Sequence, residues 1–217
     1  VLLAGYWIDR IWLSDMKHSQ TAIDYYDQQA EALADSYEAV AFESAYPFLV
    51  DRLRQGGLAI ADIGAGTGRD AAWLAGFGHA VTAVEPSDAM RRLAENLHPN
   101  GEIAWVAARF PTLSDTALQN NQFDLVLANA VWMHIAPDQR VASLERIDEL
   151  LKPGRSAIIS LRMGPADPAR GMFTVDPTEF VLQAQQVGFD VVPQGDFPDV
   201  LGRPEVSWKV YELIAPS

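Results

Sequence analysis

The stretch from Leu58 to Leu74, LAIADIGAGTGRDAAWL, constrains the fold more than any other part of the chain. Its apolar start, Leu58–Ile60, predicts a buried strand that ends at Asp62. Three glycines follow at alternate positions, and the segment from Arg69, rich in Ala and Leu, predicts a helix. A strand, a glycine turn and a helix in this order point backbone amides and a helix N-terminus at a ligand, and glycine lets that ligand approach the backbone closely.

The spacing of these glycines discriminates between ligands. A dinucleotide fingerprint, G-x-G-x-x-G, would need its third glycine where this chain has Arg69. The sequence DIGAGTG instead resembles the first motif of the class I S-adenosylmethionine-dependent methyltransferases. The resemblance implies that S-adenosylmethionine binds here and leaves as S-adenosylhomocysteine, and that the contacts come from Asp62, Gly64, Ala65, Gly66, Thr67 and Gly68. A nicotinamide-dependent oxidoreductase stays the alternative from another enzyme class.

A second predicted strand, Ala80–Val84, ends in Glu85. This acid lies close to the distance after the glycine turn, about 20 residues, expected for a carboxylate that binds ribose. One carboxylate can accept hydrogen bonds from two neighbouring hydroxyls. A helix is predicted from Pro86-Ser87 to Leu97, and the resemblance extends the cofactor contacts to Pro86, Ser87 and Met90.

The third predicted strand, Ile103–Ala107, departs from the family pattern. Relatives commonly have an acid after it that binds the adenine amino group, whereas this chain has Ala108, Arg109 and Phe110. Adenine is therefore expected either to contact backbone groups and apolar faces at these three residues, Phe110 among them, or to be bound less selectively. Because the acid is missing, a non-catalytic protein that binds S-adenosylmethionine or S-adenosylhomocysteine is a further alternative.

The fourth predicted strand is Gln122–Val131, QFDLVLANAV. It resembles the family's fourth motif and implies cofactor contacts at Asn129, Ala130 and Val131. It lacks the N-P-P-Y sequence of relatives that methylate nucleobase amino groups. Ligands bind beyond the carboxyl ends of strands in open α/β sheets, so Trp132 is a candidate acceptor contact. His134 is the candidate catalytic base, because a neutral imidazole can take a proton from a hydroxyl or amine. The alternative is a structural histidine that orients Trp132.

The carboxyl-terminal half continues the alternation of helices and strands. Helices are predicted over 137–151 and 176–187, with strands over 156–161, 189–192 and 206–214. Two loops, 162–175 and 193–205, are long enough to suggest function. Arg162 and Arg170 are candidate acceptor contacts, and with Arg203 they could recognise a carboxylate, although ordinary surface arginines are the alternative.

The amino-terminal part, residues 16–55, is predicted to form a helical cap: one or two helices over 21–42 and another over 44–54. The resemblance implies that Tyr25 and Tyr37 cover the methionine end of the cofactor, while helix packing alone also explains tyrosines at this spacing. Val1–Leu13 is either an amphipathic packing helix, with Leu3, Trp7 and Ile11 on one face, or a non-native extension.

Composition limits the partners. The chain has 16 Lys and Arg and 29 Asp and Glu, which gives a net charge of −13. This negative charge repels nucleic acid, so a small-molecule acceptor is expected. The chain has no cysteine, which suits a cytoplasmic protein, and its four histidines form no metal motif, so no metal is expected. No membrane span is expected, because the apolar start is too short and carries charges. The 217 residues fit one domain, with a Rossmann-like core over 56–217: a doubly wound, mostly parallel sheet with helices on both faces. The resemblance implies seven strands with an antiparallel last strand.

Overall fold

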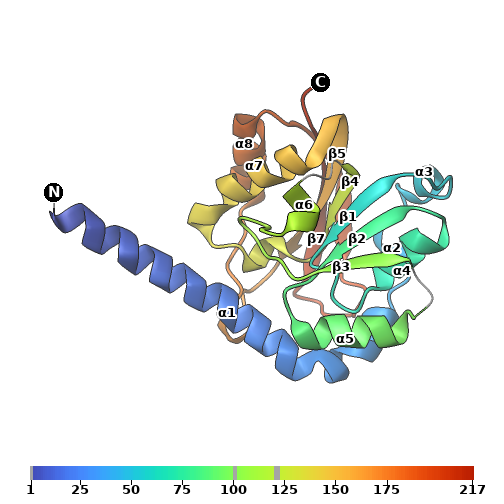
Figure 1. Cartoon of the computed structure of the whole chain (residues 1–217), viewed down its shortest axis with the longest axis horizontal. Coiled ribbons are helices and arrows are strands. Elements are labelled where there is room, and N and C mark those ends of the chain that lie inside the picture. The colour runs from blue at the N-terminus through green and yellow to red at the C-terminus, as the bar shows by residue number, and fades with distance from the viewer. Residues whose placement is uncertain (1, 100–101, 120–122) are drawn as a thin grey trace.

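A seven-stranded sheet in the order β3-β2-β1-β4-β5-β7-β6 forms the centre of the molecule in this computed structural model (Figure 1). The structure describes residues 2–99, 102–119 and 123–217, with side chains from residue 20 onward. Strands β1 to β5 run parallel, and β7 runs antiparallel to both β5 and β6. The strands are β1 (Ala59–Ile63), β2 (Ala80–Val84), β3 (Ile103–Val106), β4 (Phe123–Ala128), β5 (Leu151–Met163), β6 (Asp190–Pro198) and β7 (Ser207–Ile214). This confirms the predicted Rossmann-like, mostly parallel sheet with an antiparallel last strand.

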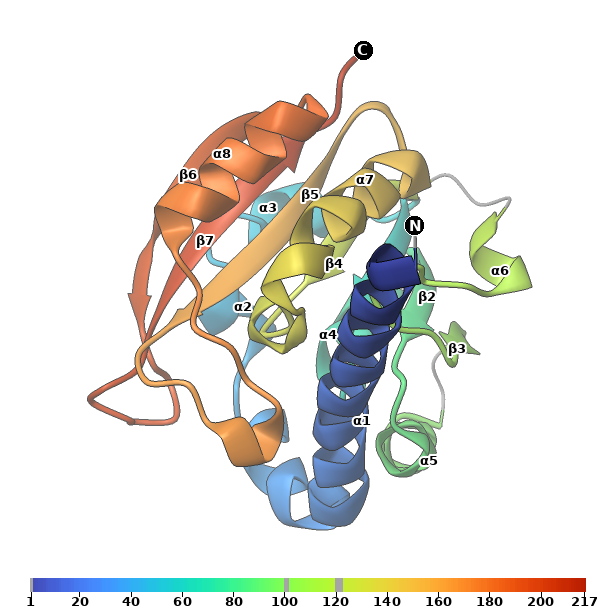
Figure 2. The same ribbon diagram turned by 90° about the vertical axis from the view of Figure 1, so that its left-hand side faces the viewer.

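Helices cover both faces of the sheet. Helices α2, α3 and α4 pack on one face, and α7 and α8 on the other (Figures 1 and 2). The helices of the chain are α1 (Leu2–Glu38), α2 (Phe42–Ala45), α3 (Val50–Leu53), α4 (Arg69–Gly76), α5 (Asp88–Leu97), α6 (Thr116–Gln119), α7 (Arg140–Leu150) and α8 (Pro177–Val187). The described residues also form three short 3₁₀ turns: η1 (Trp132–His134), η2 (Pro137–Gln139) and η3 (Pro168–Arg170).

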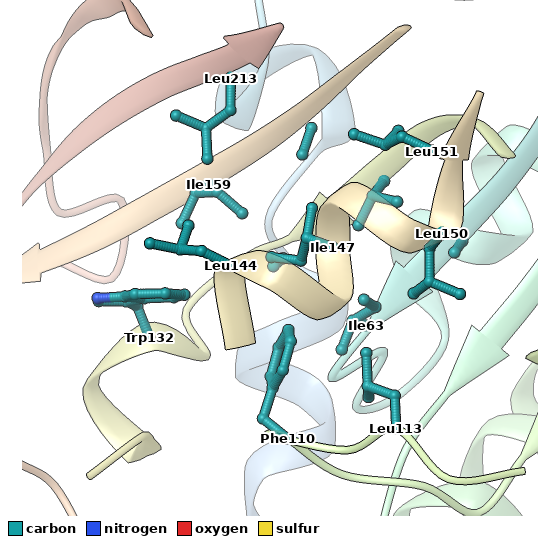
Figure 3. Packing of buried hydrophobic residues seen from close by; sticks show 14 of the residues in the cluster. Ile63, Phe110, Leu113, Trp132, Leu144, Ile147, Leu150, Leu151, Ile159 and Leu213 are labelled. Atoms are coloured by element: carbon teal, nitrogen blue, oxygen red, sulfur yellow. The ribbon is translucent and has the colours of Figure 1, made fainter. Parts of the chain in front are cut away.

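The core under α7 shows why the apolar stripe of this helix matters. Leu144 and Ile147 are fully buried and lie against Ile159 of β5, in the cluster drawn in Figure 3. Every residue of β4 is buried, as expected of a central strand covered on both faces. Burial of apolar area at about 25 cal/mol per Å² makes this double-sided packing the main stabilising term of the fold.

The strand order places a topological switch point between β1 and β4. From β1 the chain winds outward through β2 to β3, and from β4 it winds the other way. The carboxyl ends of β1, β2, β4 and β5 therefore meet at one edge of the sheet, where ligands bind in folds of this kind.

Helix α1 is a single long helix that crosses near this edge beside α5, and its amino-terminal half extends beyond the rest of the molecule (Figures 1 and 2). The predicted helices over 21–42 are thus one helix that ends at Glu38, followed by α2. The side chains of the predicted apolar face, Leu3, Trp7 and Ile11, lie outside the described residues. No helix in the described part of the chain has the length and apolar character needed to cross a membrane.

Several predicted boundaries differ from the structure; for example, the strand predicted over 156–161 is the longer β5, and the strand predicted over 122–131 is the shorter β4. The helix expected over 44–54 is two short helices, α2 and α3, because Pro47 between them has no amide hydrogen to donate to a helix. The loop expected over 193–205 begins only after Pro198, since β6 continues along β7 through a register shift at Gly195. The paired hairpin extends the sheet to the mouth of the cavity described next.

Candidate active site

A cavity of about 350 Å³ lies at the carboxyl edge of the sheet, where the sequence predicted a ligand. It is bounded by the turn after β1, the ends of β2, β4 and β5, helix α1 and the β6–β7 hairpin. The predicted site residues that line it are Tyr37, Asp62, Gly64, Ala65, Gly66, Thr67, Glu85, Pro86, Met90, Ala108, Arg109, Phe110, Asn129, Ala130, Val131, His134, Arg162 and Arg170.

Trp132 corrects one of the predictions. It does not line the cavity, and its side chain is fully buried in the apolar cluster drawn in Figure 3. Its ring packs edge-on against Phe180, with 5.1 Å between the ring centroids. In the 3₁₀ turn η1 successive side chains point in different directions, so His134 lines the cavity while Trp132 lies in the core. Trp132 is a packing residue and is no longer a candidate acceptor contact.

Three further residues lie next to the cavity wall without lining it. Gly68 is the N-cap of α4 and has a φ of +81°. A Cβ there would lie 3.0 Å from the Trp105 ring, so packing requires this glycine. Ser87 caps α5 and its amide donates to Glu85, 2.8 Å away. Tyr25 lies under the Arg170 guanidinium, 5.3 Å from the ring centroid. These three residues support groups that do line the cavity.

Tyr26 takes the place predicted for Tyr25. Adjacent residues of a helix point about 100° apart, so one of the two tyrosines must turn away from the site. Tyr26 and Tyr37 lie about three turns apart on the same face, and both hydroxyls accept a hydrogen bond from Arg170, at 3.0 and 3.3 Å. That common face was a readable signal in the sequence.

The glycine turn presents free backbone to the cavity. Gly64 has a φ of +73°, and a Cβ there would lie 2.3 Å from the side chain of Val131, in the segment that follows β4. Close packing against Val131 therefore requires glycine at this position. Gly66 has a φ of +56°, and a Cβ there would meet no protein atom within 4 Å. Because Gly66 lines the cavity, that open space is room for a ligand against the backbone.

Glu85 is held in place at the end of β2. Its two carboxylate oxygens accept hydrogen bonds from the backbone amides of Gly66, at 3.0 Å, and Ser87, at 2.8 Å. Burial raises its pKa, and these two hydrogen bonds act in the opposite direction. Each oxygen keeps a second lone pair, so the carboxylate can still accept hydroxyl donors from a ligand.

Asp62 and Asp70 bring negative charge to the floor of the cavity. Asp62 is 2% exposed, and its Oδ2 has no hydrogen-bond partner among the described residues. Burial and then the nearby Asp70 raise the Asp62 pKa well above its usual value, while Arg69 opposes the shift. Arg69 itself forms an ion pair with Asp70 at 2.7 Å. The unpaired carboxylate oxygen therefore suits a ligand that brings a cationic donor.

Replacing Asp62 by Asn should stabilise the ligand-free protein at neutral pH. The raised folded-state pKa means that folding disfavours the charged form, so Asp62 lowers stability as the pH rises above its unfolded value, about 3.9. Asn removes that penalty, and the melting temperature at pH 7 should rise, whereas affinity for a cationic ligand should fall. Asp124→Asn is the matched control: Lys152 and the Ala59 amide bind this carboxylate at 2.9 and 3.0 Å, so its removal should lower the melting temperature. A lower melting temperature for both variants would contradict this account of Asp62.

A hydrogen-bonded unit supports the end of β4. The Ser160 hydroxyl donates to Asn129 Oδ1 at 2.7 Å and accepts from the Ala130 amide at 2.8 Å. Ala130 has a φ of +56°, a left-handed conformation that costs a non-glycine residue about 1–2 kcal/mol. Strain of this kind is often found at ligand sites, and Ser160, which the sequence did not identify, lines the cavity as well.

His134 is the centre of a second polar group. Its Nδ1 lies 3.3 Å from the Gly171 carbonyl, which can only accept, so Nδ1 carries the hydrogen. Nε2 is then free to accept from the Tyr26 hydroxyl, 3.2 Å away. Burial lowers the His134 pKa to about 4, and the positive charge of Arg170 adds to the shift. The imidazole is therefore neutral at physiological pH, as a base must be.

Several cavity residues were not identified from the sequence. Tyr46 and Asp70 are buried beside Asp62, and Trp208 and Asp199 come from the β6–β7 hairpin. Asp199 and Arg203 are four residues apart, and their side chains form two hydrogen bonds at 2.9 and 2.7 Å. This spacing could have suggested the pair from the sequence. No group of three potential metal-binding acids or histidines occurs among the described residues.

Comparison with known proteins places this site in a family context. Residues 61–159 match the model of a family described as "Methyltransferase domain". No curated protein matches the chain significantly by sequence.

Solved structures with the same fold are numerous. A TehB-like S-adenosylmethionine-dependent methyltransferase of Corynebacterium glutamicum is 24% identical, with a TM-score of 0.61 over 90% of this chain and 98% of that one. The 1,6-didemethyltoxoflavin-N1-methyltransferase of Burkholderia thailandensis, solved with its acceptor and S-adenosylhomocysteine, is 20% identical, with a TM-score of 0.70 over 93% and 90%. The magnesium protoporphyrin IX methyltransferase of Synechocystis, solved with S-adenosylmethionine, is 18% identical, with a TM-score of 0.60 over 91% and 83%. The predicted resemblance is thus confirmed: residues 61–159 match the methyltransferase-domain model, and the chain has the fold of solved S-adenosylmethionine-dependent methyltransferases.

Proposed function

We propose that this protein transfers a methyl group from S-adenosylmethionine to a small-molecule acceptor. The observation that carries the proposal is the turn after β1, where Gly66 leaves backbone open to the cavity and Asp62 presents an unpaired carboxylate oxygen. S-adenosylmethionine contains both an ammonium and a sulfonium cation, so an acidic cavity floor suits its charge.

The residues present fit this cofactor. Glu85 would accept hydrogen bonds from the ribose hydroxyls, and Asp62 would accept from the ammonium group. Met90 and Phe110 offer apolar surface in the same cavity. Phe110 and Ala108 stand where relatives have an acid, so adenine would be bound through apolar contact and backbone groups. The bound cofactor would supply an activated methyl group on sulfur.

Methylation then depends mainly on alignment and on the fate of one proton. Holding the acceptor in line with the methyl group turns a bimolecular reaction into an intramolecular one. A hydroxyl or amine acceptor must lose a proton, and the neutral His134 is the group available to take it. Because Tyr26 lies at 3.2 Å from His134 Nε2, the proton passes either directly to the imidazole or through the Tyr26 hydroxyl.

Support for a small acceptor comes from the shape of the site. The cavity continues from the predicted cofactor residues to the β6–β7 hairpin, where Phe197, Val200 and Trp208 line it. Two neighbours in fold, the toxoflavin and protoporphyrin enzymes, are named for small-molecule acceptors. The negative net charge of −13 opposes a nucleic-acid substrate.

Glu85→Ala tests the cofactor half of the proposal. The expected result is a loss of about 1–3 kcal/mol in the binding of S-adenosylhomocysteine, the cost of leaving buried polar groups unpaired. Isothermal titration calorimetry measures it, with Glu95→Ala on the exposed side of α5 as the matched control. An unchanged dissociation constant for Glu85→Ala would remove Glu85 from the cofactor site.

A further inference from the structure

Three arginines gather at the end of the cavity formed by β5, η3 and the β6–β7 hairpin. Arg162 lies near the end of β5, Arg170 in η3 and Arg203 in the hairpin loop, and all three line the cavity. The protein as a whole carries a net charge of −13, so a cluster of cations inside this cavity does not follow from the overall charge of the chain.

Among these three arginines, Arg203 alone has its charge neutralised by a described carboxylate. It forms an ion pair with Asp199 at 2.7 Å, and Asp199 also accepts from the Trp208 ring nitrogen at 3.1 Å. Arg170 donates to two neutral tyrosine hydroxyls, and Arg162 donates to the Pro165 carbonyl at 2.7 Å. In the described part of the chain no carboxylate forms an ion pair with Arg162 or Arg170.

Both unneutralised arginines also have an unused donor. The Nε atoms of Arg162 and Arg170 are buried and have no hydrogen-bond partner among the described residues. A buried donor without a partner is costly, and it is uncommon in folded proteins. Burial lowers the Arg162 pKa, Arg203 and Arg170 add to this shift, and Asp199 and Glu205 oppose it. The charges of Arg162 and Arg170 are therefore close enough to repel each other. An anion between them would relieve both costs.

The wall beside these arginines is apolar. Phe197, Val200, Leu201 and Trp208 of the hairpin region line the cavity, and Val200 and Leu201 are 54% and 36% exposed. Large hydrophobic side chains exposed at a cavity rim mark a binding surface for an apolar group. The acidic residues Asp62, Asp70 and Glu85 belong to the glycine-turn end of the same cavity.

We propose that the methyl acceptor carries a carboxylate or phosphate group bound by Arg162 and Arg170, and an apolar body that packs on the β6–β7 hairpin. This inference rests on the proposed function, because it names the acceptor class of that same cavity. Guanidinium groups bind both oxyanions through paired hydrogen bonds, so the shared feature is the planar donor set. The anionic group of the acceptor takes part in binding and does not react. Arg170 contacts Tyr26, and Tyr26 contacts His134, so the reacting hydroxyl or amine of the same molecule would lie near His134, where it would give up its proton.

The test uses the full chain and three probes of similar shape: benzoate, phenyl phosphate and the neutral benzamide. Binding is measured by calorimetry with saturating S-adenosylhomocysteine, for the wild type, Arg162→Gln and the control Arg92→Gln. Arg92 is an arginine on α5 with 76% of its side chain exposed. Arg162 is chosen over Arg170 because Arg170 also holds Tyr26 and Tyr37 in place.

The wild type and Arg92→Gln should bind benzoate or phenyl phosphate with a dissociation constant of about 10 mM or lower. Benzamide should show no binding at these concentrations. Arg162→Gln should weaken binding of the anion by about tenfold to a hundredfold, which is the effect of losing a charged hydrogen bond. The preferred probe shows whether the group is a carboxylate or a phosphate. Equal binding of benzamide, no binding of either anion, or unchanged affinity in Arg162→Gln would overturn the proposal.

Failure of the proposed function gives a different result. If S-adenosylhomocysteine does not bind the wild type, the methyltransferase function fails, and the same probes are titrated without it. Anion binding that depends on Arg162 would then keep the anion site while removing its role as an acceptor site. Anion binding that does not depend on Arg162 would remove both.

Discussion

His134→Gln is expected to slow methyl transfer about 10²–10⁴-fold, the usual contribution of a general base. The neutral imidazole lines the cavity, and its Nε2 faces the Tyr26 hydroxyl at 3.2 Å. Glutamine keeps a hydrogen-bonding side chain but cannot take up a proton at these pH values. The measurement is single-turnover methylation at several pH values, with the affinity for S-adenosylhomocysteine measured alongside and expected to stay unchanged.

The pH profile separates catalysis from structure at this residue. Because burial lowers the His134 pKa to about 4, the base form predominates above that pH, so the wild-type rate should show no inflection near 6.5. The same shift makes the folded protein less stable as the pH falls from about 6.5 towards 4, since the unfolded chain takes up a proton first. His134→Gln should remove that stability loss. A wild-type rate with an unchanged pH profile in His134→Gln would end its assignment as a base, and His98→Gln, outside the cavity, is the control.

Gly66→Ala is expected to weaken S-adenosylhomocysteine binding about a hundredfold or more while the protein still folds. The added Cβ meets no protein atom within 4 Å, so it projects into the space where the ligand approaches the turn. Pushing the ligand away breaks more than one hydrogen bond to the turn, at about 1–3 kcal/mol each. The left-handed φ of +56° adds a folding cost of about 1–2 kcal/mol.

Gly57→Ala separates these two effects. Gly57 has a φ of +76° and lies away from the cavity, and a Cβ added there would likewise meet no atom within 4 Å. This variant should lose similar stability and bind the ligand normally. If both variants bind S-adenosylhomocysteine like the wild type, the glycine turn does not contact the ligand.

The core of the fold was predictable from the sequence because local signals and burial agreed there. The strand over Ala80–Val84 was predicted with its observed ends. Helix α8 has the expected cap residues, Asp176 at its N-terminus and Gly188 at its C-terminus. These signals depend on turn chemistry and apolar periodicity, which are local. The prediction of one helix over 44–54 was wrong because it did not take into account Pro47, which lies inside that segment.

The site was predictable in its strand ends and less so in its side-chain directions. Residues that follow β1, β2 and β4 line the cavity because parallel strands place their carboxyl ends together. Which of two adjacent aromatic residues faces the ligand depends on helix rotation and tertiary packing. The sequence therefore indicated Tyr25 where the structure has Tyr26, and it placed Trp132 in the site together with His134. The spacing of Asp199 and Arg203 could have suggested their ion pair, but only the three-dimensional structure shows that Arg162 and Arg170 line the same cavity and form no ion pair with a described carboxylate.

The most direct test of the central claim is calorimetric titration of the full wild-type chain with S-adenosylmethionine, S-adenosylhomocysteine and NAD. The Gly64–Gly68 turn, with an arginine where a dinucleotide fingerprint has glycine, predicts that both sulfur-containing nucleosides bind with dissociation constants of about 1–100 μM. NAD should give no measurable heat of binding. Binding of NAD with no response to S-adenosylmethionine or S-adenosylhomocysteine would contradict the account.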